Sequence, residues 1–205
     1  MPTFPKDASS HTRSVNAPRA LGMDPADFDR ASRGLVARHA TGVIEGAWGT
    51  AWDVGRYAFI ERDSENPDTV HPSLWRQAQL NAIHGLFEVA PGCWQARGYD
   101  ISNITFIAGS TGWIVIDPLT IEGTARACLE LANESLGSRP VVAVIYTHSH
   151  VDHFGGVRGV VVGRNDADCV RARAVVAGRC PVSVGHRRAR RLPRGHEGVR
   201  RTLPA

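Results

Sequence analysis

The stretch PVVAVIYTHSHVDHFGG, residues 140–156, joins an apolar run of strand length to a cluster of three histidines and one aspartate. His148 and His150 lie two positions apart, so in an extended segment their side chains project to the same side and can hold one metal ion together. A strand that ends in such a pair predicts a layered α/β fold, because catalytic groups in these folds gather where the strands end.

The second half of the motif predicts a second metal ion beside the first. Asp152 and His153 follow at once, where the chain must turn to let Gly155 and Gly156 pass, and a turning backbone can aim both side chains at a neighbouring ion. Imidazoles with one carboxylate suit zinc, with iron or manganese as alternatives. Such an ion lowers the pKa of its bound water from about 15.7 to about 7, which is hydrolytic chemistry. The alternative is a surface loop whose histidines bind nothing, which the spacing disfavours.

Two other polar residues could in principle contribute to the site. His84 is expected to be a surface or helix-terminal histidine rather than a ligand. Asp117 ends the WIVID run beside Pro118, and a turn or cap role is favoured over contact with a metal-binding residue. No catalytic side chain beyond the metal ligands is predicted.

Length and composition predict one soluble globular domain, since the chain has 205 residues of which 42% are hydrophobic and 21% charged. No window approaches about eighteen consecutive apolar residues, and residues 1–15 lack the basic-then-apolar order of a secretory signal, so we expect no membrane span and a cytoplasmic location. The four cysteines form no CxxC pair and are too few for a disulfide framework. Cys93 and Cys128 are interpreted as small apolar fillers.

Helix signals come first along the chain. Residues 24–40 offer Asp24 as an N-cap and an apolar face that includes Leu35, and residues 72–85 carry an apolar stripe that Gly85 could stop. Residues 1–22 are polar and interrupted by prolines, which predicts a flexible arm.

From Gly85 onward the pattern changes to short runs of β-branched and aromatic residues. The runs LFEVA, CWQARG, NITFIAG and GWIVID predict consecutive strands, with residues 109–112 as a hairpin-like connection. Residues 120–137 have helical spacing with Gly137 as C-cap, and the strand that delivers the histidines follows.

These segments resemble a known family. THSHVDH is similar to the metal-binding signature of the metallo-β-lactamase fold, a four-layer αββα sandwich. PSLWRQAQLNAIHGLFEV, RGYDISNITFIAGSTGWIVIDPLT, TARACLELA and RPVVAVIYTHSHVDHFGGVRGVV together resemble the alkyl sulfatases, from about residue 40 to Val162. The resemblance implies hydrolysis of alkyl sulfate esters such as dodecyl sulfate. It also assigns His148 and His150 to one zinc ion, and Asp152 and His153 to the other.

The sequence departs from that family after Val162. A catalytic zinc usually takes three protein ligands and a water, so two per ion form an incomplete set. In the family the remaining ligands, the second half of the sandwich, a helical dimerisation region and a lipid-binding-like domain follow downstream. We therefore expect residues 23–162 to be the N-terminal part of the hydrolase domain, of doubtful activity alone and without the family's homodimer contact. A non-catalytic fragment and another hydrolase of this fold are the alternatives.

Residues 163–205 have a different composition. They hold 11 Arg and no Lys against 3 acidic residues, a net charge of +8, whereas residues 1–162 hold 13 basic against 17 acidic residues, a net charge of −4. The segment has no aromatic residue, which predicts disorder. The favoured interpretation is an out-of-frame translation of a GC-rich gene. A nucleic-acid-binding tail and a source of replacement ligands are the alternatives, the latter through the residues Cys169, Cys180, His186, His196 and Glu197. Overall we expect a small-molecule substrate and no nucleic-acid partner.

Overall fold

The structure is a computed structural model. Its main element is a mixed eight-stranded sheet. The structure describes residues 6–17, 24–60, 62–161, 173–176 and 181–183, with side chains as far as residue 161. The strands follow one another across the sheet in the order β1 (Leu35–Ala37), β4 (Gly85–Ala90), β5 (Cys93–Arg97), β6 (Ile104–Ala108), β7 (Trp113–Ile116), β8 (Val141–Tyr146), β9 (Arg173–Val176) and β10 (Pro181–Ser183). Neighbours from β1 to β7 are antiparallel, β7, β8 and β9 are parallel, and β10 is antiparallel to β9.

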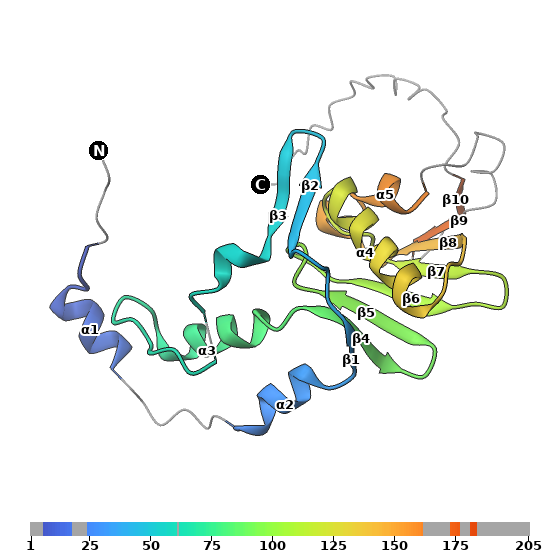
Figure 1. Cartoon of the computed structure of the whole chain (residues 1–205). Coiled ribbons are helices and arrows are strands. Elements are labelled where there is room, and N and C mark those ends of the chain that lie inside the picture. The colour runs from blue at the N-terminus through green and yellow to red at the C-terminus, as the bar shows by residue number, and fades with distance from the viewer. Residues whose placement is uncertain (1–5, 18–23, 61, 162–172, 177–180, 184–205) are drawn as a thin grey trace, which may run out of the picture.

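The other elements are α1 (Ser10–Asn16), α2 (Ala26–Ser32), the hairpin β2 (Val43–Gly46) and β3 (Gly49–Asp53), η1 (Val54–Tyr57), α3 (Pro72–Asn81), α4 (Glu122–Leu136), η2 (Val151–His153) and α5 (Val157–Val161). Of these, α4 and α5 lie beside the sheet, and α1, α2 and α3 lie to one side of it, beyond β1 (Figure 1). The long α4 is the crossover between parallel strands β7 and β8, as a parallel connection requires. None of the helices in the described part of the chain is long and apolar enough to cross a membrane.

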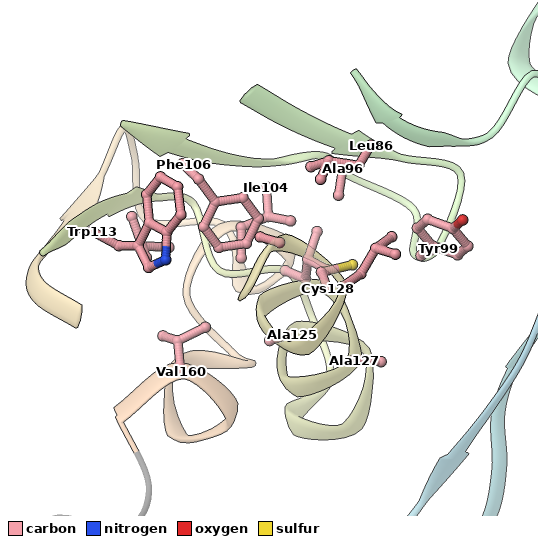
Figure 2. Close-up of a cluster of buried hydrophobic side chains, with 14 of the residues drawn as sticks. Leu86, Ala96, Tyr99, Ile104, Phe106, Trp113, Ala125, Ala127, Cys128 and Val160 are labelled. Atoms are coloured by element: carbon pink, nitrogen blue, oxygen red, sulfur yellow. The ribbon is translucent and has the colours of Figure 1, made fainter. Parts of the chain in front are cut away.

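The core lies between one face of the sheet and helices α4 and α5. Alternate residues of the strands point to this face. Figure 2 shows Phe106 and Trp113 directed from the sheet toward the helices, and Val160 of α5 facing them from the helix side of the core. Phe106 and Trp113 are fully buried and their rings meet edge to face, with centroids 6.0 Å apart. The strands predicted from the β-branched and aromatic runs are confirmed, and their buried face packs against α4.

One sheet with helices over one face is one half of an αββα sandwich. The side chains that point to the other face, such as Ile107, Ile114 and Ile116, are only partly buried. The predicted α/β class and the incomplete sandwich are therefore confirmed in the described residues. Strands β9 and β10 extend the sheet within the segment that we expected to be disordered, and the remainder of residues 163–205 lies outside the described residues.

Two predicted helix ends differ from the structure, and two elements of the structure were not expected. Helix α2 ends at Ser32, and Leu35 belongs to strand β1, because Gly34 adopts a φ of +77° and lies against the β4 backbone, where a Cβ would come within 2.2 Å of the Glu88 carbonyl oxygen. Helix α3 ends at Asn81, before Gly85, which already belongs to β4. The hairpin β2–β3 was not predicted. Within the expected N-terminal arm, the structure has helix α1.

The N-terminus of α4 is held by a carboxylate from another part of the chain. The N-cap position is Ile121, which has no side-chain oxygen. Asp100, 7% exposed, instead accepts hydrogen bonds from the Thr120 hydroxyl at 2.7 Å, the Thr124 hydroxyl at 2.6 Å and the Thr120 amide at 3.2 Å. Because Asp100 also accepts from the Ile101 amide at 2.7 Å, it ties the loop after β5 to α4.

Candidate metal centre

The histidine motif lies at the C-terminal end of β8, as predicted. After Tyr146 the chain leaves the sheet, forms the single turn η2 and enters α5. The turn is closed by backbone hydrogen bonds from Gly155 to the Val151 carbonyl at 2.7 Å and from Gly156 to the Leu119 carbonyl at 2.9 Å. A Cβ on Gly156 would lie 2.3 Å from the Pro118 carbonyl oxygen, so only glycine lets the turn approach the loop after β7 this closely.

The structure brings the three predicted histidines together. The ring centroids of His148 and His150 are 4.7 Å apart, and those of His148 and His153 are 3.9 Å apart. His148 and His150 are exposed, whereas the side chain of His153 is 22% exposed. Three imidazoles at the mouth of one turn are therefore available to a ligand from solvent.

His153 lies between two carboxylates. Its Nδ1 is 2.9 Å from Asp117 Oδ2, and its Nε2 is 3.3 Å from Asp152 Oδ2. The Nδ1 contact lacks hydrogen-bond geometry, so this buried nitrogen has no hydrogen-bond partner in the described part of the chain. A buried ring nitrogen without a hydrogen-bond partner is expected where a ligand completes the site.

Asp117 supports the motif from the neighbouring strand. It is 8% exposed, adopts a φ of +54° immediately after β7, and accepts hydrogen bonds from the Thr147 amide at 2.8 Å and the Thr147 hydroxyl at 2.6 Å. A left-handed conformation is unfavourable for a residue other than glycine and persists only where surrounding contacts hold it. Asp117 therefore has the expected turn role and also contacts His153 and Thr147 directly, although the sequence favoured the turn role over such a contact.

A signal for this contact was present in the sequence. Asp117 directly follows β7 and Thr147 directly follows β8, and the two strands are parallel neighbours in which Ile116 pairs with Ile145. The contact required knowing that β7 and β8 are adjacent. Nothing in the sequence indicated another contact to the motif. The Ser102 hydroxyl donates a hydrogen bond to the Asp152 carbonyl oxygen.

The donor types fit a zinc site, although the described residues do not complete one. Imidazole and carboxylate are zinc ligands. However, no group of three or more His, Cys, Asp or Glu side chains within the described ranges is arranged to hold an ion. His84 stays apart from the motif, with its ring edge-on to Tyr99 at 5.7 Å, as expected of a non-ligand. The alternative ligands of the tail, from Cys169 to Glu197, lie outside the described residues.

Comparisons with known proteins agree with this fold and motif. Residues 97–178 match the Metallo-beta-lactamase superfamily. The chain is 50% identical to a linear primary-alkylsulfatase and 48% identical to an (R)-specific secondary-alkylsulfatase, both from Pseudomonas sp, in each case over 160 residues that make up 76% of this chain and 24% of the relative. It also superimposes on the solved structure of the stereoselective inverting sec-alkylsulfatase Pisa1 from Pseudomonas sp with a TM-score of 0.74 and 45% identity, covering 82% of this chain and 27% of that one.

The sheet with its crossover helix and strand-end histidine motif has a metallo-β-lactamase-like fold. Over its first part the chain is similar to alkylsulfatases, as the resemblance of its sequence segments implied. It spans about a quarter of the length of the relatives that it matches.

Proposed function

We propose that this protein acts in the hydrolysis of alkyl sulfate esters, dodecyl sulfate among them, with zinc bound at its histidine motif. His148 and His150 would hold one ion, and Asp152 and His153 the other. The observation that carries the proposal is that three imidazoles lie together at the end of β8. The chain is also 50% identical to an alkylsulfatase over 160 residues. Bound zinc supplies a nucleophile at neutral pH, because it lowers the pKa of a water ligand to about 7.

The protein's own residues orient the donors. The Asp117 carboxylate lies 2.9 Å from His153 Nδ1 and would help to hold the orientation of this ring as a ligand. Thr147 holds the Asp117 carboxylate with two hydrogen bonds, so the placement of the motif depends on how β7 and β8 lie beside each other. Asp152 lies within reach of His153 Nε2 and would have to turn toward the ion on binding.

A second candidate function is metal binding without turnover. It is favoured because no group of three or more His, Cys, Asp or Glu side chains in the described part of the chain is arranged to hold an ion, whereas a catalytic zinc usually has three protein ligands. A site short of ligands binds zinc weakly and leaves the ion poorly oriented, and catalysis depends on that orientation.

One pair of measurements separates the two candidates. The purified chain is dialysed against zinc and its metal content determined, and sulfate released from dodecyl sulfate below the micelle concentration is then followed by ion chromatography. His148→Ala is the test variant, and His11→Ala, which removes an exposed histidine of α1 far along the chain from the motif, is the control. Sulfate release that His148→Ala abolishes and His11→Ala keeps supports hydrolysis. Zinc uptake that depends on His148 without sulfate release supports the second candidate, and zinc uptake equal in both variants contradicts both.

A further inference from the structure

A cavity of about 1020 Å³ lies beside α3, away from the histidine motif. Its walls come from α3, from the turn η1 after β3, and from the loop that follows β5; α3 and η1 are neighbours in Figure 1. The apolar side chains Trp52, Ile60, Ile83 and Ile101 line it, and no residue of the segment 147–153 does. A cavity of this size and lining is suited to a small molecule with a long apolar part.

One cation in the cavity wall lacks an ionic partner. Arg97, the last residue of β5, stacks its guanidinium on the Phe87 ring, 3.7 Å from the centroid. Its Nε is buried without a hydrogen-bond partner, and Arg97 forms no ion pair within the described ranges. Burial lowers the pKa of Arg97, with no carboxylate acting against it, yet a guanidinium stays charged at neutral pH. Arg97 is only partly buried, but even a partly buried charge without an ionic partner is unfavourable, so an anion at this position would be stabilising.

The acidic residues of the cavity wall are already engaged. Asp27 Oδ1 lies 3.1 Å from Arg30 Nη1, and its Oδ2 lies 3.0 Å from Arg76 Nη2. Both carboxylate oxygens of Asp100 accept hydrogen bonds from the start of α4. Within the described ranges neither carboxylate forms an ion pair with Arg97, so its guanidinium remains available to a ligand. An apolar cavity with one available cation selects a molecule with one apolar chain and one anionic head.

We propose that this cavity binds an anionic amphiphile, an alkyl chain that ends in a sulfate or a carboxylate, with the head paired to Arg97. A planar guanidinium suits both heads, because its N–H groups match two oxygens of either anion. The site is separate from the proposed metal centre and does not depend on zinc. The wall of the cavity nevertheless reaches the motif, because Ile101 lines the cavity and the adjacent Ser102 bonds to the Asp152 carbonyl.

The test is isothermal titration calorimetry on the metal-free chain with probes below their micelle concentrations. Octyl sulfate and octanoate are expected to bind with one-to-one stoichiometry, and the tighter of the two identifies the preferred head. Octyltrimethylammonium has a similar chain with the opposite charge and should bind at least tenfold more weakly. Equal binding of the cationic probe, or no binding of either anion, would overturn the proposal.

Three variants locate the head group. Arg97→Gln is expected to weaken binding of the anionic probe at least tenfold, and Arg97→Lys, which keeps the charge, should restore most of the affinity. The matched control is Arg139→Gln, because Arg139 also stacks on an aromatic ring, 5.1 Å from the Trp113 centroid, but does not line the cavity. Far-UV circular dichroism checks that each variant is folded. If Arg97→Gln does not fold, Arg97→Lys is the test instead, and loss of binding in Arg97→Lys would overturn the proposal. Affinity unchanged in Arg97→Gln overturns it as well.

Discussion

The carboxylate of Asp100 is the single group whose loss should most weaken the start of α4. It replaces the N-cap side chain that Ile121 lacks and binds both Thr120 and Thr124 from a distance of twenty or more positions in the sequence. We therefore predict that Asp100→Ala opens the first turn of α4 and releases the loop that carries Ser102 to the motif.

The size of the effect follows from the bonds that are lost. Hydrogen bonds to a charged group contribute about 1.5–3 kcal/mol each, and a lost helix cap costs about 1 kcal/mol. The Thr124 hydroxyl can turn to the Ile121 carbonyl, 2.8 Å away, so its bond is partly replaced, whereas the hydroxyl of Thr120 has no second acceptor in the described part of the chain. We expect a loss of about 3 kcal/mol for Asp100→Ala, since removing one member of a buried charged network costs on the order of 3–5 kcal/mol before such compensation.

Hydrogen exchange of backbone amides measures this change locally. Exchange in the first turn of α4 should accelerate on the order of 100-fold, because each 1.4 kcal/mol corresponds to about a factor of ten. The amides of α3 serve as the internal control. Asp100→Asn keeps the shape and one acceptor oxygen, and should lose less than half as much protection. If Asp100→Ala changes α4 exchange by less than threefold, the assigned capping role is wrong.

Two further predictions concern packing. Gly156→Ala should lower the free energy of unfolding by about 3 kcal/mol, because the new Cβ would lie 2.3 Å from the Pro118 carbonyl oxygen and neither backbone can yield without shifting the motif. Urea titration measures the loss, and an unchanged midpoint would argue against the close approach. Burial raises the pKa of the Cys128 thiol, so its thiolate is scarcer than in solution; at pH 8 a maleimide should label the half-buried Cys93 first, and equal labelling by peptide mapping would contradict the burial.

Features that depend on neighbouring residues in the chain were predictable from the sequence. Short runs of β-branched and aromatic residues from Gly85 onward indicated the strands β4 to β7, because such residues favour strands. The helical spacing before Gly137 indicated α4, because a period of 3.6 places an apolar face in a core whatever the partner is. The spacing of His148, His150 and His153 also indicated that the three imidazoles lie close together, as the structure shows, whereas metal binding by them stays a prediction.

Contacts between distant segments were decided only by the tertiary structure. Whether Leu35 continued a helix or joined a sheet depended on Gly34 meeting the β4 backbone, which the local pattern does not encode. The contact of Asp117 with His153 needed β7 and β8 side by side, and the burial of Arg97 without a counter-ion needed β5 to meet α3 and η1. Charge pairing depends on distances through space, and such distances appear only once the sheet order has been set.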